Sequence, residues 1–204
     1  DLDRFHSSII KANGVFYTYG YSWENDILQN NALKDAVFTI CPIDRATHDK
    51  SLEKDISRTM NNFIRRARWF VIADVILAVN GRKFFDRKNW NKYVKTAGGH
   101  YGEPHFDVND LRAKIRRINS SKGRRVLLEC KGMVETRRDC FGHILGSFMH
   151  RLFAYLIKKY SGSAGISDAN ASALIVRSFK ENLATTSQSP VRLHHARQFA
   201  FLMS

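Results

Sequence analysis

The sequence predicts an α/β fold in which part of a parallel sheet is followed by a predominantly helical C-terminal region. Residues 15–19, Val-Phe-Tyr-Thr-Tyr, are β-branched and aromatic with almost no polar break, which is typical of a strand buried on both faces of a parallel sheet. From residue 23 onwards, apolar residues recur at helical spacing instead. We therefore expect a partial α/β unit over residues 1–43 and a basic, mostly helical region over residues 44–204.

The predicted strand leads into a helix. The strand ends at Gly20, and Ser22 is a good N-cap for a helix that begins near Trp23. Apolar residues at helical spacing extend this helix to about Ile40. Pro42 ends it, because a residue that precedes proline is disfavoured in the helical conformation. Such a helix can cover one face of the sheet.

A second, longer helix is predicted over residues 51–79. Ser51 is a good N-cap, apolar residues form a wide stripe, and Asn80-Gly81 has the composition of a C-cap. Asp74 lies within the most apolar section, where an unpaired carboxylate would be strongly destabilising. We therefore expect Asp74 to pair with an arginine and to have a structural role.

Further helices are predicted in the second half of the chain. Asp107 or Asn109 begins a short helix, residues 142–160 carry a clear apolar stripe, and later helices begin at Asp168 and Pro190. Between residues 82 and 104, basic and aromatic residues are interleaved, which leaves two interpretations open. The aromatic side chains either pack inward from an amphipathic helix or stack on the bases of single-stranded or looped nucleic acid.

The charge of the chain favours a polyanionic partner. Its 204 residues include 33 Lys and Arg against 19 Asp and Glu, which gives a formal net charge of +14. Such a surplus attracts nucleic acid through counterion release without specifying a sequence. Three other interpretations stay open: a basic surface that serves solubility, an acidic protein partner and an anionic membrane surface.

Cysteine usage and hydropathy predict a cytoplasmic protein. Cys41, Cys130 and Cys140 are dispersed and lack the spacing of a zinc site, which fits a reducing compartment better than a disulfide framework. The sequence shows no signal-peptide pattern and no apolar run long enough to cross a bilayer. We therefore expect a cytoplasmic protein that does not span a membrane, and we favour nucleic acid over an anionic membrane surface as its partner.

Acidic residues near the predicted strand are candidate metal ligands. Asp1 and Asp3 are one residue apart, so at the end of a strand both carboxylates can approach one hard divalent cation, directly or through its waters. Glu24 falls in the first turn of the following helix, at the edge where open α/β sheets place their ligands. The alternative is that Asp1 and Asp3 are solvated residues without a ligand.

These motifs resemble those of a known family. The Asp-Leu-Asp opening, the run Phe-Tyr-Thr-Tyr-Gly-Tyr-Ser-Trp-Glu-Asn-Asp-Ile-Leu over residues 16–28 and Cys-Phe-Gly-His-Ile-Leu over residues 140–145 are similar to the Toprim-type effectors of bacterial anti-phage systems. The similarity is greatest to the effectors of PARIS systems. It extends over much of the chain, and its sharp motifs lie in the first quarter. The resemblance implies a partial Toprim-like parallel sheet.

The resemblance also implies roles for individual residues. Toprim domains bind magnesium for phosphodiester chemistry through a glutamate on an early strand and a later Asp-x-Asp, which would be Asp1 and Asp3 and would hold Mg²⁺ or Mn²⁺. The strand with that glutamate has no counterpart here, so we expect the chain to be the latter part of a longer protein. Glu24 would add an outer carboxylate or a ligand to a second metal ion. His143 would approach the scissile phosphate as an acid or a ligand, and the alternative for it is a capping or core histidine.

The function that the resemblance implies is a metal-dependent nuclease of anti-phage defence. It would be a toxin-like, abortive-infection effector that cleaves host RNA, with transfer RNA as the expected substrate. An ABC-type ATPase partner would hold it inactive until a phage trigger frees it, and it would then form a homodimer. The alternative is a noncatalytic nucleic-acid-binding or regulatory subunit. A third interpretation is a protein-interaction domain whose basic face meets an acidic partner.

Two groups of basic residues are candidate phosphate contacts. The first lies on the helix predicted over residues 51–79, and the second lies on and after the helix that begins near residue 109. The candidate nucleic-acid-binding residues are Arg65, Arg66, Arg68, Lys114, Arg116, Arg117, Lys122, Arg124 and Arg125. A solvated helix face is the alternative for the first group. The sequence assigns no role to His6, His100, His105, His194 and His195.

Overall fold

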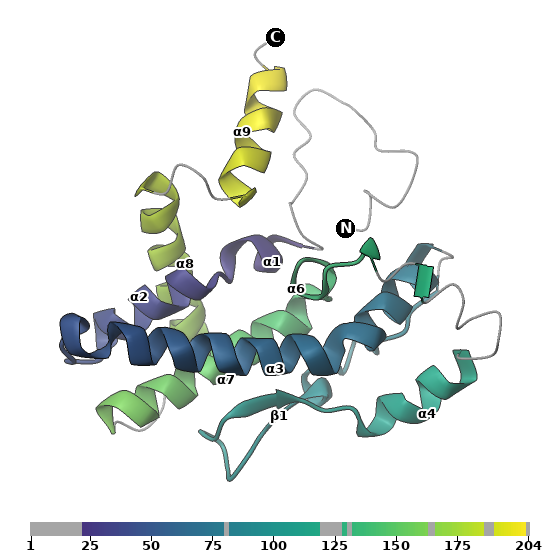
Figure 1. Ribbon diagram of the computed structural model, residues 1–204, viewed down its shortest axis with the longest axis horizontal. Helices are drawn as coiled ribbons and strands as arrows, with labels where there is room; N and C mark the ends of the chain where they lie inside the picture. Colours follow the sequence, from purple (N-terminus) through teal and green to yellow (C-terminus); the bar gives the residue numbers. More distant parts are fainter. Residues whose placement is uncertain are drawn as a thin grey trace.

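The computed structural model describes residues 22–79, 82–118, 128–129, 132–162, 166–185 and 190–202 (Figure 1). This part of the chain is mostly helical and contains one short antiparallel hairpin. The elements are α1 (Trp23–Ile27), α2 (Asn30–Ile40), α3 (Arg45–Val79), the 3₁₀ helix η2 (Trp90–Tyr93), β1 (Val94–Thr96), β2 (Pro104–Phe106), α4 (Asn109–Ile118), α6 (Thr136–Asp139), α7 (Gly142–Ser161), α8 (Asp168–Thr185) and α9 (Pro190–Leu202). The predominantly helical C-terminal region is confirmed. The strand predicted over residues 15–19 lies outside the described residues, and the sheet that the structure describes is antiparallel.

One hydrophobic core joins the long helices α3 and α7 to the hairpin. The ring of Phe63 in α3 lies 4.3 Å from that of Phe148 in α7, centroid to centroid, and meets Phe106 of β2 edge-on at 5.7 Å. All three side chains are buried, and burial of each such side chain contributes about 1.5–3 kcal/mol. The helices α1 and α2 pack against α7 and α8, so residues 22–43 share this core with the region after residue 44.

The first predicted helix is divided in two. α1 ends at Ile27 and α2 begins at Asn30. Between them, the side-chain amide of Gln29 donates hydrogen bonds to the backbone carbonyls of Asn25 and Asp26, each at 3.0 Å. These side-chain bonds satisfy carbonyls at the end of α1 that would otherwise accept from the next helical turn. The prediction of one continuous helix is therefore wrong at this point.

The long helix α3 begins earlier than predicted. It starts at Arg45 rather than Ser51, because the Asp44 carboxylate accepts hydrogen bonds from the backbone N–H groups of Thr47 at 2.8 Å and Ala46 at 3.3 Å. The hydroxyl of Thr47, together with these amides, lowers the pKa of the Asp44 carboxyl. The apolar stripe begins further along the helix, so apolar spacing alone places the start too late.

The aromatic side chains between residues 82 and 104 pack mainly inward. Phe84, Phe85 and Tyr93 are buried in the core, although the chain here forms loops and η2 rather than an amphipathic helix. Trp90 is only partly buried. Of the two open interpretations, inward packing therefore holds for these three residues, whereas Trp90 keeps part of its surface exposed.

Asp74 pairs with an arginine, as predicted. Its Oδ2 atom lies 2.6 Å from Nη2 of Arg87, and its Oδ1 atom accepts hydrogen bonds from the backbone N–H groups of Phe84 and Phe85 at 3.0 and 3.2 Å. The Arg87 guanidinium also stacks over the ring of Phe141, 4.1 Å from its centroid. The buried Asp74 carboxylate thus holds the backbone of the loop after α3 in place. Its partner Arg87 in turn contacts Phe141, the residue before α7.

The hairpin is not predicted by the sequence patterns, whereas the helices α4, α7, α8 and α9 agree with them. β1 and β2 pair in an antiparallel register with Val94 opposite Phe106, and Gly98 and Gly99 in the turn adopt the positive φ values that favour glycine. The helices predicted from residues 142, 168 and 190 are α7, α8 and α9. None of the helices in the described ranges is long and apolar enough to cross a membrane.

Candidate active site

Glu24 and His143, the candidate catalytic residues that the structure describes, are in direct contact. Oε1 of Glu24 lies 3.0 Å from Nδ1 of His143, and the hydroxyl of Ser22 donates a hydrogen bond to Oε2 of Glu24 at 2.5 Å. The Glu24 side chain is 9% exposed, whereas the His143 side chain is 54% exposed. The buried carboxylate therefore orients the imidazole through Nδ1, and Nε2 is the ring nitrogen left for chemistry.

Two helix starts bring these residues together. α1 begins directly after its N-cap Ser22, as predicted, and the backbone N–H of Ser22 donates to the side-chain carbonyl of Asn25 at 3.0 Å. α7 begins at Gly142, which puts His143 in its first turn. A Cβ atom at Gly142 would overlap Oγ of Ser22 and would lie 2.7 Å from Oε2 of Glu24. The absence of a side chain at Gly142 therefore allows α7 to approach α1 this closely.

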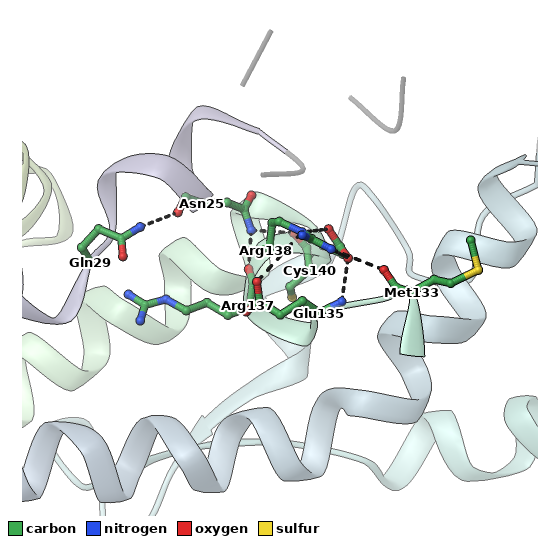
Figure 2. A network of polar contacts seen from close by, with 8 residues as sticks. Asn25, Gln29, Met133, Glu135, Arg137, Arg138 and Cys140 are labelled. Atoms are coloured by element: carbon green, nitrogen blue, oxygen red, sulfur yellow. Dashed lines mark hydrogen bonds and ion pairs between the residues drawn. The ribbon is translucent and has the colours of Figure 1, made fainter. Parts of the chain in front are cut away.

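Hydrogen bonds tie α1 to α6 and to the residues before α7 (Figure 2). The side-chain amide of Asn25 donates to the backbone carbonyls of Arg137 and Cys140 at 2.7 and 3.0 Å. The guanidinium of Arg137 donates to the backbone carbonyl of Leu28 at 2.6 Å, and burial lowers the pKa of this guanidinium. These bonds join segments far apart in the sequence. They therefore fix the position of Glu24 in α1 relative to His143 in α7.

The two cysteines within the described ranges are core residues. Cys41 and Cys140 are buried as free thiols, and burial raises the pKa of each. A buried, uncharged thiol is a poor nucleophile and a poor metal ligand. The cysteines therefore contribute packing rather than chemistry.

A mostly apolar pocket of about 230 Å³ opens beside the Glu24–His143 pair. Trp23 of α1 and Trp90 of η2 both line it, and the ring of Trp90 packs against that of His143 with a centroid distance of 5.5 Å. The other lining residues are Leu28, Gly146, Ser147, His150 and Ser172. An apolar hollow with a few polar groups, next to a paired acid and histidine, has the form of a ligand site. The sequence gives no signal for this pocket, because its walls come from separate elements.

The predicted metal site depends on residues outside those described. Asp1 and Asp3 belong to the part of the chain whose placement is not described, and within the described ranges no three His, Cys, Asp or Glu side chains gather as metal ligands. Both oxygens of Glu24 already have partners in Ser22 and His143. Mg²⁺ and Mn²⁺ prefer carboxylate ligands, so Asp1, Asp3 and Glu24 are ligands of the right chemical type. A complete metal site would need Asp1 and Asp3 close to Glu24.

Some predicted phosphate contacts have protein partners instead. Nε of Arg66 donates to the backbone carbonyl of Phe106 at 2.9 Å, which fastens α3 to β2. The ammonium of Lys114 contacts the backbone carbonyl of Phe84 and lies 4.7 Å from the centroid of its ring. Burial lowers the pKa of Lys114. These two residues therefore have structural roles in the described fold.

Arg66 and Lys114 are nevertheless exposed, as are several of the other predicted phosphate contacts. Arg65, Arg116 and Arg117 are exposed and Arg68 is partly exposed, on the helices α3 and α4, which pack against each other. Nη2 of Arg65 donates to the side chain of Asn62 at 3.2 Å on its own helix. Lys122, Arg124 and Arg125 lie outside the described residues. The exposed surface of α4 is thus the best placed part of the predicted nucleic-acid-binding group.

His195, which has no predicted role, pairs with a buried carboxylate. Nε2 of His195 in α9 lies 3.1 Å from Oδ2 of Asp26 in α1, and Asp26 is buried. This contact joins the last helix to the first, which apolar spacing cannot predict. His100 and His105 lie in the turn and second strand of the hairpin.

Comparison of the chain with family models, with curated proteins and with solved structures found no match. The site is therefore characterised by its own geometry. It consists of a buried carboxylate that orients a half-exposed histidine at the mouth of an aromatic pocket, in a strongly basic chain.

Proposed function

We propose that the protein is a metal-dependent nuclease that hydrolyses phosphodiester bonds in RNA, with the Glu24–His143 pair in its active site. The observation that carries this proposal is the 3.0 Å contact between Oε1 of Glu24 and Nδ1 of His143. Both residues belong to the motifs that resemble Toprim-type effectors, and they come from distant parts of the sequence. Their direct contact is therefore compatible with a shared catalytic site.

Each residue of the pair has a role in this proposal. The Glu24 carboxylate orients the imidazole, and Nε2 of His143 gives a proton to the leaving oxygen or takes one from the attacking water. Ser22 fixes the carboxylate through its second oxygen. Asp1 and Asp3 would hold Mg²⁺ or Mn²⁺, which when bound supplies a polarised water and positive charge at the phosphate. The proposal also includes the partial Toprim-like parallel sheet, which would carry Asp1 and Asp3.

The substrate and the biological role follow from charge and resemblance. A net charge of +14 supports a polyanionic substrate, and the exposed Arg116 and Arg117 of α4 suit contacts with its phosphates. The resemblance points to host RNA, with transfer RNA as the substrate, and to a toxin-like role in anti-phage defence in the cytoplasm. It also points to an ABC-type ATPase partner that restrains the nuclease and to a homodimer after release.

The second candidate function is a noncatalytic nucleic-acid-binding or regulatory subunit. The exposed arginines of α4 favour it as much as they favour a nuclease, because phosphate contacts alone provide binding. Such a subunit would bind RNA without a metal ion, and its affinity would fall steeply with salt. Dependence on a metal ion therefore separates the two functions.

The test is cleavage of total RNA and of plasmid DNA by the complete gene product, purified without partners, in Mg²⁺, Mn²⁺ or EDTA. We expect RNA to be cut only with a metal ion. His143→Asn, Glu24→Gln and the double variant Asp1→Ala with Asp3→Ala should each lower the rate by roughly 100-fold or more, as expected for loss of a general acid–base group or a metal. His100→Asn, in the hairpin turn, is the matched histidine control and should cut at the wild-type rate.

Two results would decide against a nuclease. Binding of RNA without cleavage in any metal ion would favour the noncatalytic subunit. Cleavage that persists in His143→Asn and Glu24→Gln would remove this pair from the active site, even if the chain is a nuclease.

A further inference from the structure

The pocket beside the Glu24–His143 pair has no part in the proposed proton transfer. Its volume of about 230 Å³ is below the roughly 300–1,000 Å³ of pockets that hold drug-sized ligands. It therefore suits one small group rather than a long ligand. The contact of Trp90 with His143 places the aromatic wall directly against the histidine that would act on the phosphate.

The two tryptophans give the pocket its chemical character. Trp23 is 52% exposed, so much of its apolar surface lies in water and gains nothing from burial. Trp90 is partly buried and lines the same pocket from η2. Two indole side chains at one hollow offer flat π surfaces to a planar ligand. Every nucleobase has such a face, and stacking of bases on aromatic side chains tolerates any sequence.

Polar groups in the pocket suit the edge of a nucleobase. Ser147 of α7 and Ser172 of α8 both line it, and a hydroxyl can donate or accept a hydrogen bond. A nucleobase presents both donors and acceptors along its edge. A purely apolar ligand would not use these hydroxyls.

We propose that this pocket holds one unpaired nucleobase of the RNA substrate, stacked on Trp23 and Trp90, with the adjoining phosphate beside Nε2 of His143. The inference rests on the proposed function and adds the substrate class, which is single-stranded or looped RNA. A base within a duplex is paired and stacked, so it cannot enter the pocket unless it is first extruded. The captured base then determines which phosphate lies at the catalytic pair.

The test measures the affinity of the complete protein for three RNA probes in EDTA, by fluorescence anisotropy at fixed salt. The probes are oligouridine of about ten nucleotides, a strand of the same length that lacks all bases, and a duplex. The wild type should bind oligouridine roughly 5- to 100-fold more tightly than the baseless strand, which is the range expected from stacking. Trp23→Leu and Trp90→Leu should lose most of this difference and should bind the baseless strand as the wild type does.

Controls separate stacking from folding. Trp69→Leu is the matched control, because Trp69 is 38% exposed on α3 and does not line the pocket. Trp90→Phe retains an aromatic face and should restore part of the preference for bases. Thermal unfolding shows whether each variant is folded. Trp23→Leu changes an exposed position and carries the test if Trp90→Leu fails to fold.

The outcomes distinguish the base pocket from the proposed function. Equal wild-type affinity for oligouridine and the baseless strand would contradict the proposal that the pocket binds a base. A loss of affinity in Trp69→Leu as large as the losses in the pocket variants would contradict it as well. In both cases RNA cleavage by the wild type leaves the proposed function intact. Absence of both binding and cleavage overturns the proposed function, and the base pocket with it.

Discussion

Nδ1 of His143 faces Oε1 of Glu24 at 3.0 Å, in a contact between a buried carboxylate and a half-exposed ring. An ionised carboxylate only accepts hydrogen bonds, so the neutral imidazole must carry its proton on Nδ1. Nε2 is then unprotonated. This arrangement can be tested without any assay of activity.

We expect nitrogen-15 spectra at a pH where imidazole is neutral to show His143 as the Nδ1–H tautomer. In Glu24→Ala, the ring should shift towards the Nε2–H tautomer that free histidine favours. His100, in the hairpin turn, should be unchanged between the two proteins and serves as the control. A dominant Nε2–H tautomer at His143 of the wild type would contradict the orientation described above.

The close approach of α1 and α7 predicts opposite effects at two glycines of α7. Gly142→Ala should destabilise the protein by about 1–3 kcal/mol, because the new methyl group displaces Ser22 and the buried Glu24 carboxylate from their hydrogen bond. At Gly146 an added Cβ meets only Cδ1 of Leu28, at 3.8 Å. Gly146→Ala should therefore stabilise by about 0.5–1 kcal/mol, as alanine does within helices. Urea unfolding measures both, and equal effects would argue against the close approach at Gly142.

The buried ion pair after α3 predicts a large loss of stability. Asp74→Ala leaves the charge of Arg87 without its carboxylate and the N–H groups of Phe84 and Phe85 without an acceptor. We expect the free energy of unfolding to fall by about 3–5 kcal/mol. The control is Glu53→Ala, which removes an exposed carboxylate from a surface ion pair and should change stability by less than about 1 kcal/mol. Similar losses in the two variants would show that the buried pair contributes no more than a surface pair.

Asp55 makes the contact between α3 and α7 sensitive to acid. Burial raises the pKa of its carboxyl, but hydrogen bonds from Lys159 and Tyr160 outweigh this effect and hold the pKa below its ordinary value. A carboxyl whose folded-state pKa is lowered contributes stability at pH values above its unfolded pKa, which is about 3.9. That contribution is lost as the pH falls through the folded-state pKa.

We therefore expect Asp55→Asn to be less stable than the wild type by about 1–2 kcal/mol at neutral pH. The difference should shrink as the pH falls below the unfolded-state pKa of about 3.9 and through the folded-state pKa. Urea unfolding over a series of pH values measures it. Glu181→Gln, which removes an exposed carboxylate paired within α8, should differ little from the wild type at any pH. A difference at Asp55 that stays constant into strong acid would refute this linkage.

The exposed arginines of α4 predict a change in salt dependence. The double variant Arg116→Ala with Arg117→Ala should bind all RNA sequences more weakly and lower the slope of log K against log salt by about 1.4, because each phosphate contact of a single strand contributes roughly 0.7. Arg177→Ala removes an exposed arginine paired with Glu181 on α8 and should leave the slope unchanged. An unchanged slope in the double variant would remove α4 from the interface.

Much of the helical fold can be predicted from apolar spacing, because the core is built from the apolar stripes of long helices. The starts of α7, α8 and α9 agree with the sequence. The start of α3 and the break before α2 do not agree. Asp44 and Gln29 determine them through side-chain hydrogen bonds to the backbone, which leave no trace in apolar periodicity.

The sequence identifies individual residues of the candidate site but does not predict that they are in contact. Motifs single out Glu24 and His143 separately, and only the packing of α1 on α7 brings them into contact. Gly142, directly before His143, is the local sign of that close approach. The pocket is less predictable still, because Trp23 and Trp90 lie in segments whose proximity depends on the whole core.

The position of the catalytic pair in the sequence has a consequence for synthesis on the ribosome. At common elongation rates of about 5–20 residues per second, Glu24 is made roughly ten seconds before His143. A nascent chain that ends before α7 carries the carboxylate with no histidine beside it, and the two meet only when α7 emerges and docks on α1. Under the proposed function, the ribosome that makes this nuclease would complete most of the basic helical region before the bound chain could act on RNA.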